Sequence, residues 1–114
     1  MAEREPKLYL EDIRTSIERI EKYTENLTFE DFSKNIIVID TVLRNLSIIG
    51  ETAKNLPEEI KSKYPDIPWN EIMGMRNKVI HEYFGVDEGI LWKTIKDDLP
   101  ALKTQISKIL ELLK

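Results

Sequence analysis

The chain has 114 residues, of which 41% are hydrophobic and 33% are charged, and this composition is typical of a single soluble domain with one core. It contains no cysteine, which excludes disulfides and thiolate chemistry, and its single histidine argues against an all-protein zinc site but leaves magnesium binding by carboxylates open. The net charge of −4 argues against a broad, non-specific grip on nucleic acid but leaves room for a small basic pocket.

The start of the chain does not resemble a secretory signal peptide. The first seven residues lack the apolar core of a signal peptide, and no apolar run reaches the length of about 18 residues that a membrane-spanning helix needs. We therefore expect a cytoplasmic protein that contacts no membrane and forms one domain over residues 1–114, with residues 1–6 as a disordered tail.

Apolar residues recur at helical spacing along the first half of the chain. They predict one helix over residues 7–27 and a second over residues 29–56. Between them, Thr28 with Asp31 three residues later resembles a capping box that starts the second helix. Pro57 ends that helix.

The second half of the chain continues the helical pattern after a proline-rich loop. A short extra turn is expected at residues 57–60, and a third main helix from Pro68 to Tyr83 or Phe84 with Gly85 at its C′ position. Asp87 is the expected N-cap of a last helix that reaches Leu112 and kinks near Pro100. The sequence thus predicts an all-α bundle of four main helices plus a short extra turn.

The predicted helix over residues 29–56 carries a polar stripe beside its apolar arc. One interpretation is a second packed surface, as a homodimer interface or a binding site would need. The other is a solvated face with i,i+4 ion pairs such as Asp40–Arg44. The stripe comprises Asp40, Arg44, Ser47, Glu51 and Lys54, within about 40° of one another on a helix, and Ile36, Ile37 and Ile48 border it.

The only histidine, His81, lies in the run R-N-K-V-I-H-E-Y at residues 76–83. On a continuous helix Arg76 would lie on a mostly apolar arc, while His81 would lie about 140° away on a polar flank. Asn77 would then lie one turn below the histidine, and Gly74 would leave room for a partner helix or a ligand. The simpler alternative is a solvated histidine beside an arginine that pairs with a carboxylate. Tyr83 would be a core aromatic with its hydroxyl at a wet edge.

Further residues accompany this run on both sides. They are Ile48-Ile49-Gly50-Glu51, Ile67-Pro68-Trp69, Gly74-Met75, Val86-Asp87 and Trp92. The run at residues 76–83 resembles the R-x4-H-x-Y pattern of HEPN domains. With the accompanying residues, the resemblance to this family extends over residues 8–112. The resemblance is specifically to the HepT-like toxins, which pair with minimal nucleotidyltransferase (MntA-like) antitoxins.

The resemblance implies a HEPN-type bundle, a homodimer and a metal-independent endoribonuclease that cleaves tRNA or mRNA. It also implies the toxin role in a type VII-like HEPN/MNT toxin–antitoxin system. In this interpretation Tyr83 is the residue that the nucleotidyltransferase partner modifies with AMP, which would block RNA entry and repel its phosphates. No cofactor is expected.

The residue types at the run suit metal-free RNA cleavage. His81 would act as general acid or base, and Arg76 would bind the scissile phosphate through parallel N–H bonds. Asn77 would orient the imidazole. Ser47 and Glu51 resemble the upstream polar pair of many HEPN members, and Glu51 would hold Arg76 or favour the charged imidazolium.

A non-catalytic alternative shares the same fold. In it, the polar cleft of a helical binding module recruits a nucleotide or positions a nucleotidyltransferase partner. A purely structural four-helix dimer would leave the polar stripe unexplained. The sequence favours the enzyme because Arg76, His81 and Tyr83 are all present.

Overall fold

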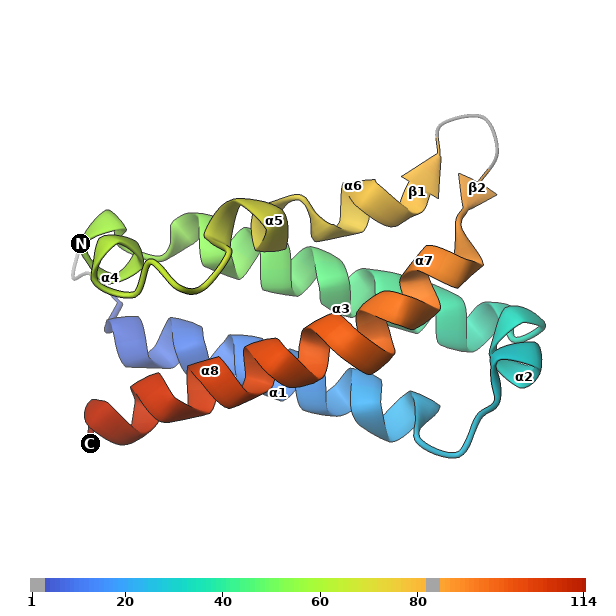
Figure 1. The fold of residues 1–114 in the computed structure, drawn as a ribbon, viewed down its shortest axis with the longest axis horizontal. Helices are drawn as coiled ribbons and strands as arrows, with labels where there is room; N and C mark the ends of the chain where they lie inside the picture. Colours follow the sequence, from blue (N-terminus) through green and yellow to red (C-terminus); the bar gives the residue numbers. More distant parts are fainter. Residues whose placement is uncertain (1–3, 82–84) are drawn as a thin grey trace.

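The computed structural model describes residues 4–81 and 85–114, and at residues 79–81 we use the backbone alone. The long helices α1, α3 and α8 pack together, and the shorter α5 and α6 lie along α3 (Figure 1). The helical elements are α1 (Pro6–Thr24), α2 (Phe29–Ser33), α3 (Ile36–Asn55), α4 (Glu58–Lys63), α5 (Trp69–Met73), α6 (Met75–Val79), α7 (Glu88–Lys93), the π-helix η1 (Thr94–Asp98) and α8 (Leu99–Leu112). None of the described helices is both long and apolar enough to cross a bilayer.

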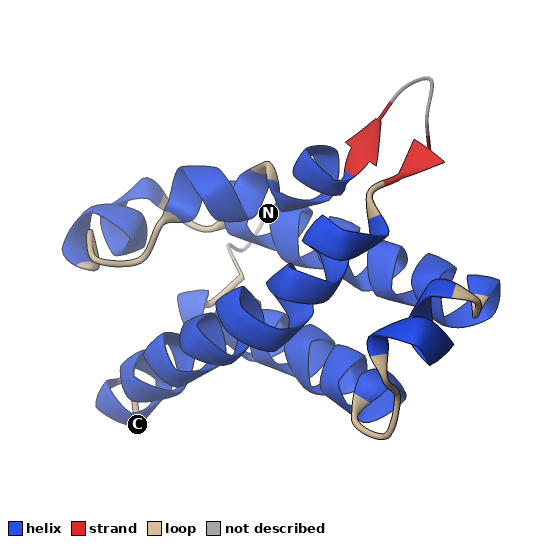
Figure 2. Ribbon diagram, turned by 45° about the vertical axis from the view of Figure 1, so that its right-hand side comes forward, coloured by secondary structure: helices blue, strands red, loops and turns tan. Residues whose placement is uncertain are grey.

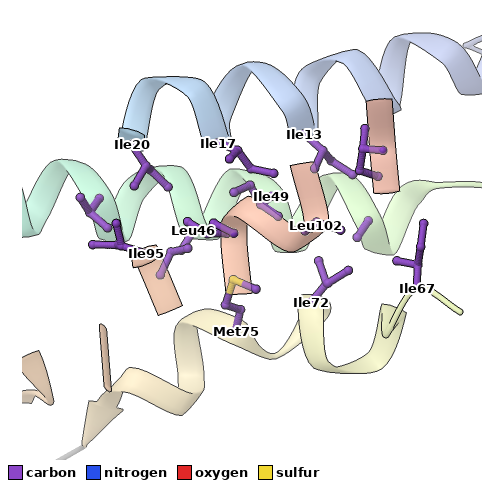
Figure 3. Close-up of a cluster of buried hydrophobic side chains, with 14 of the residues drawn as sticks. Ile13, Ile17, Ile20, Leu46, Ile49, Ile67, Ile72, Met75, Ile95 and Leu102 are labelled. Carbon is purple, nitrogen blue, oxygen red and sulfur yellow. The ribbon is translucent and has the colours of Figure 1, made fainter. Parts of the chain in front are cut away.

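One apolar core holds the bundle together and confirms the predicted all-α fold. Figure 3 shows side chains of α1, α3, α5, α6 and the last helical stretch meeting in a single cluster. Each such isoleucine or leucine contributes roughly 1.5–3 kcal/mol when it is fully buried. The buried members of this core cluster include Ile13, Ile17, Ile20, Leu46, Ile49, Ile72, Met75, Ile95 and Leu102.

The predicted single helix over residues 29–56 is wrong, because the structure divides it into α2 and α3. Asn35 lies between them as the N-cap of α3, and its Oδ1 accepts a hydrogen bond from the backbone N–H of Val38 at 3.1 Å. Asparagine is among the preferred N-cap residues because its side chain satisfies a free N–H of the first turn. The predicted cap at Thr28 is confirmed, since its Oγ1 accepts from the N–H of Asp31 at 3.1 Å.

The predicted third main helix, from Pro68 to Tyr83 or Phe84, is also wrong. Gly74 is a turn between α5 and α6, and α6 ends at Val79. The chain then enters a short antiparallel pair of strands, β1 (Ile80–His81) and β2 (Gly85–Val86), with His81 opposite Gly85. In Figures 1 and 2 this pair projects from the bundle beyond α6.

Two physical features explain this change from helix to strand. Val79 and Ile80 are β-branched, and such residues favour extended backbone. Gly85 has φ of 80°, a left-handed conformation that glycine adopts at no steric cost. The predicted C′ position of Gly85 is therefore wrong, because the residue belongs to β2 and not to a helix end.

A close contact between helices fixes α5 against α3. A Cβ atom added to Gly50 would lie 3.2 Å from the backbone oxygen of Met73. A Cβ contact this short is tighter than most, so a side chain at position 50 would require the backbone of α5 to shift by a few tenths of an ångström. At Gly74, where the sequence suggested a close approach, an added Cβ would meet its nearest atom at an ordinary 3.7 Å. Within the described chain the close approach is at Gly50, while the room at Gly74 for a partner helix or a ligand stays a prediction.

The helical stretch from α7 to α8 begins, ends and departs from regular helix geometry near the residues predicted from the sequence. The Oδ1 of Asp87 accepts from the N–H of Ile90 at 3.0 Å, which confirms the predicted N-cap. The π-helix η1 precedes Pro100, and in it the N–H of Leu99 donates to the carbonyl of Thr94. The wider π turn accommodates the ring of Pro100, which lacks an N–H and would clash in a regular helix. The predicted kink near Pro100 is therefore a π turn.

The remaining boundaries differ by a turn or less. The first helix ends at Thr24 and not at residue 27. The buried hydroxyl of Thr24 donates to the carbonyl of Ile20 at 2.8 Å. The short turn expected at residues 57–60 is the helix α4, which continues to Lys63.

Candidate functional site

The helix α6 presents the charged part of the motif to solvent. Arg76, Asn77 and Lys78 are exposed, whereas Met75 is buried in the core. The predicted apolar arc around Arg76 is therefore wrong, because the turn at Gly74 restarts the helix and gives the core position to Met75. Among the described residues Arg76 makes no ion pair, so its guanidinium is available to an external anion.

The backbone of His81 lies in β1 at the end of α6, paired with Gly85. The helix ends two residues earlier, so Asn77 is not placed one turn below the histidine on a continuous helix. The role of Asn77 toward the imidazole stays a prediction. Tyr83 lies outside the described residues. The structure thus brings Arg76 and the backbone of His81 onto one short segment, α6–β1 (Figure 1).

The upstream pair Ser47 and Glu51 lies on α3, which packs against both α5 and α6. The hydroxyl of Ser47 donates to the carbonyl of Leu43 at 3.1 Å, one turn back on the same helix. Glu51 is exposed and makes no ion pair with Arg76 in a single chain. Any contact between them belongs to an assembly of chains and stays a prediction.

The polar stripe of α3 opens onto a groove that it shares with α1. We call this surface the α1–α3 groove; its volume is about 380 Å³. Asp40 and Arg44, the proposed i,i+4 pair, make no ion pair, so the interpretation of a face held together by its own charges is not supported there. The groove is lined by Arg4, Tyr9, Arg44, Ser47, Ile48, Glu51, Thr52 and Asn55.

Sequence reasoning missed the α1 side of this groove. The guanidinium of Arg4 lies 5.0 Å from the centre of the Tyr9 ring and 2.8 Å from the carboxylate of Asp12. Arg4 falls in the segment expected to be disordered, and more than thirty positions separate it from the stripe. The helical periodicity of α3 alone could not have predicted that Arg4 lies beside the polar stripe.

Comparison with protein families gives the motif its context. The family described as "Ribonuclease HepT-like" matches residues 13–109, which include both Arg76 and His81. This chain belongs to the HepT-like ribonuclease family. Its enzyme class, a nuclease that cleaves RNA, follows from that membership and confirms the resemblance noted in the sequence.

Curated relatives agree with this assignment of the HepT-like chain. A protein of Thermococcus cleftensis named "Probable ribonuclease HepT" is 49% identical over 106 residues, which cover 93% of this chain and 96% of that protein. A protein of Caldanaerobacter subterraneus subsp. tengcongensis, named as a candidate RNase, is 44% identical over 93% of this chain and 95% of its own length.

A third relative is longer than the HepT-like chain. It comes from Methanocaldococcus jannaschii, is named as a gamma-glutamylcyclotransferase and candidate RNase, and is 49% identical over 92% of this chain but only 47% of its own length. No solved structure matches the HepT-like chain.

Proposed function

We propose that this HepT-like chain is a metal-independent endoribonuclease whose site combines Arg76 and His81 from two copies of the chain. The observation that carries the proposal is the segment α6–β1. It exposes an arginine that makes no ion pair among the described residues, five positions before the only histidine. Family membership supplies the substrate class, which is RNA.

Each residue has a defined role in the proposed reaction. The 2′-hydroxyl attacks the adjacent phosphorus, the P–O5′ bond breaks, and a 2′,3′-cyclic phosphate and a 5′-hydroxyl result. One imidazole accepts the 2′ proton and another donates a proton to the departing 5′ oxygen. Arg76 stabilises the negative charge that develops on the phosphorane oxygens, because a guanidinium stays cationic at any physiological pH.

The need for two proton-transfer groups favours a symmetric pair of chains. A single chain supplies one imidazole, whereas a two-fold assembly places two copies of Arg76 and His81 around one cleft. The start of α3 offers a contact surface, because Ile36 is 72% exposed and the neighbouring Ile37 is 79% exposed. These two adjacent isoleucines are apolar surface that a second copy of the chain would cover in the proposed pair.

Three further residues support the site in this proposal. Asn77, Ser47 and Glu51 orient the imidazole or hold Arg76 of the same or the partner copy. The single histidine gives one imidazole signal to follow by NMR. If its titration midpoint is the same in Glu51→Gln as in the wild type, Glu51 does not tune the histidine.

We also propose that the protein is the toxin of a two-component system and that a minimal nucleotidyltransferase antitoxin silences it. The target is Tyr83, two positions after His81. Attachment of AMP there would add an anion and a bulky group next to the reacting phosphate. Mass spectrometry of the tyrosine peptide after co-expression with the partner tests this. An AMP mass on the peptide is expected, and an unmodified peptide would contradict the switch.

Cleavage of a labelled tRNA or mRNA pool with EDTA present tests the catalytic proposal. The wild type should cut and leave 2′,3′-cyclic phosphate ends. His81→Ala and Arg76→Ala should each lose about 10²-fold or more in rate, as expected when a general acid–base or a charge-stabilising group is removed. Equal cleavage by the wild type and His81→Ala would contradict the assignment.

The net charge of −4 argues against a broad grip on RNA, which leaves a second candidate, a binding module without catalysis. In it the same segment recruits a nucleotide or a nucleotidyltransferase. It predicts no cleavage by the wild type, together with saturable binding of a nucleotide that Arg76→Ala abolishes.

A further inference from the structure

The α1–α3 groove differs in charge from the other hollows along the described chain. Its lining carries two arginines and one glutamate; Arg4 is paired with Asp12 at 2.8 Å, whereas Arg44 makes no ion pair among the described residues. The hollow of about 310 Å³ between α5–α6 and η1–α8 is lined instead by Glu71, Asp97 and Asp98 against Lys78. Three other hollows have at least as many acidic as basic residues in their linings. The α1–α3 groove is thus the one among these five whose lining holds more basic than acidic residues, and Arg44 is the group in it that would meet an anion.

The groove combines cationic and aromatic groups. Arg44 is exposed and makes no ion pair among the described residues. On the α1 side, the guanidinium of Arg4 lies over the half-buried ring of Tyr9, 5.0 Å from its centre. A phosphate and a flat aromatic base are the two groups that such a lining recognises.

Neutral polar residues complete the lining. Thr52 and Asn55 follow Ile48 along α3 and supply hydroxyl and amide groups without adding charge. A volume of 380 Å³ is at the lower end of the roughly 300–1,000 Å³ typical of ligand pockets. The groove is therefore suited to a short segment of one strand, and it offers too few cations to follow the backbone of a duplex.

We propose that the α1–α3 groove binds single-stranded RNA beside the cleavage site, with a phosphate at Arg44 and a base stacked on the Arg4–Tyr9 pair. This subsite rests on the proposed ribonuclease function and extends it, because it lies on the flank of α3 that carries Ser47 and Glu51. Its contribution is to substrate affinity, since none of these groups needs to touch the reacting phosphate.

Binding can be separated from cleavage in the full-length His81→Ala chain. The probes are a labelled single-stranded oligoribonucleotide and a duplex of matched length, followed by fluorescence anisotropy over a range of salt concentrations. Arg44→Gln is compared with Arg19→Gln, which removes an equal charge from an exposed position on α1 outside the groove. Tyr9→Leu is compared with Tyr9→Phe, which keeps the ring.

Arg44→Gln should weaken single-strand binding several-fold and reduce the slope of log K against log salt by about 0.7 to 1. Tyr9→Leu should weaken it roughly 5- to 100-fold, the range found for the loss of one stacked base. Arg19→Gln and Tyr9→Phe should bind as the parent does. In the chain that retains His81, Arg44→Gln should raise KM and leave kcat nearly unchanged.

Several outcomes would overturn the subsite. Equal binding by Arg44→Gln and Arg19→Gln would do so, as would a preference for the duplex. A loss of binding by Arg44→Gln that accompanies a change of oligomeric state in sedimentation would assign the residue to chain assembly instead. If the wild type cuts RNA while the groove variants bind normally, only the subsite fails. If the wild type neither cuts nor binds RNA, the proposed function fails as well.

Discussion

Asn45 is an unusual residue in the interior of this protein. It is only 4% exposed, and its Nδ2 donates to the carbonyl of Thr41 at 2.9 Å, but its Oδ1 has no hydrogen-bond partner among the described residues. An unsatisfied buried acceptor lowers stability by about 1–3 kcal/mol. Asn45→Leu, which has nearly the same shape, should therefore raise the free energy of unfolding by about 1 kcal/mol.

Urea denaturation of the wild type and Asn45→Leu checks this expectation. Asn45→Asp serves as the opposite control, because it buries a charge and removes the donor to Thr41. A lower midpoint for Asn45→Leu than for the wild type would contradict the account.

A second residue-scale feature is the ion pair between α1 and α8. The Nζ of Lys103 donates to Glu21 at 2.8 Å and lies 3.9 Å from Glu18, and the hydrogen bond to Glu21 raises the pKa of Lys103 above its usual range. A raised folded-state pKa stabilises the fold fully below the unfolded pKa of about 10.4, and this contribution is lost as the pH rises through the folded value. Since the side chain is 34% exposed, the contribution is small.

Lys103→Met should accordingly lower the free energy of unfolding at neutral pH by about 0.2–1 kcal/mol at low salt. The difference from the wild type should shrink above about pH 10.4 and at high ionic strength. Lys108→Met, at an exposed position without an ion pair among the described residues, is the control. A difference that persists unchanged at pH 11 would mean that packing of the aliphatic stem is responsible.

At the scale of elements, local signals predicted helix starts better than helix continuity. Thr28 and Asp87 cap helices as expected, because a cap is a contact within four residues. The break at Asn35 was missed because the apolar run that begins at Ile36 continues the spacing of the preceding segment. The strand at Ile80 was missed because five apolar positions around Arg76 fitted a helical arc equally well.

In the candidate site, too, contacts within one helix were predictable and contacts between helices were not. The stripe of Arg44, Ser47 and Glu51 was predictable from one helix, and the groove confirms that the three share a face. The neighbours Arg4 and Tyr9 come from another helix, and only tertiary packing brings them there.

The packing of α5 on α3 depends on Gly50, and a pair of glycine variants tests this. Alanine at position 50 would gain about 1 kcal/mol in helix propensity, but its Cβ would lie 3.2 Å from a backbone oxygen that must shift with α5. We expect Gly50→Ala to lower the free energy of unfolding by about 1–2 kcal/mol. Gly89→Ala, whose Cβ would meet only the side chain of Asp87 at 3.6 Å, should raise it by about 0.5–1 kcal/mol.

Both variants are measured by urea denaturation with the same baseline treatment. If Gly50→Ala is as stable as Gly89→Ala, then α5 is free to move away from α3 and the close contact is not structurally important.

At the scale of the whole molecule, the proposed assembly places an apolar surface of α3 against a second copy. Ile37→Lys introduces a charge at a side chain that is 79% exposed, so the fold should be retained while the two-chain assembly is lost. Ribonuclease activity should fall with it, although the residue takes no part in the chemistry. Analytical ultracentrifugation and RNA cleavage measure the two effects.

Leu112→Lys is the matched control, because Leu112 is 73% exposed at the end of α8, away from α3. It should leave both assembly and activity unchanged. Equal behaviour of the two variants would show that the isoleucines of α3 do not form the interface.

The central claim is one RNA-cleaving site built from two chains around the single histidine of each. The most direct test co-expresses the wild type and His81→Ala with different tags, isolates the mixed pair through both tags, and measures its rate on labelled RNA with EDTA present. The account predicts that the chains copurify and that the mixed pair has far less than half the rate of the wild-type pair, because the one site has lost one of its two imidazoles. Half the wild-type rate, as for two independent sites, or a failure of the chains to copurify would contradict it.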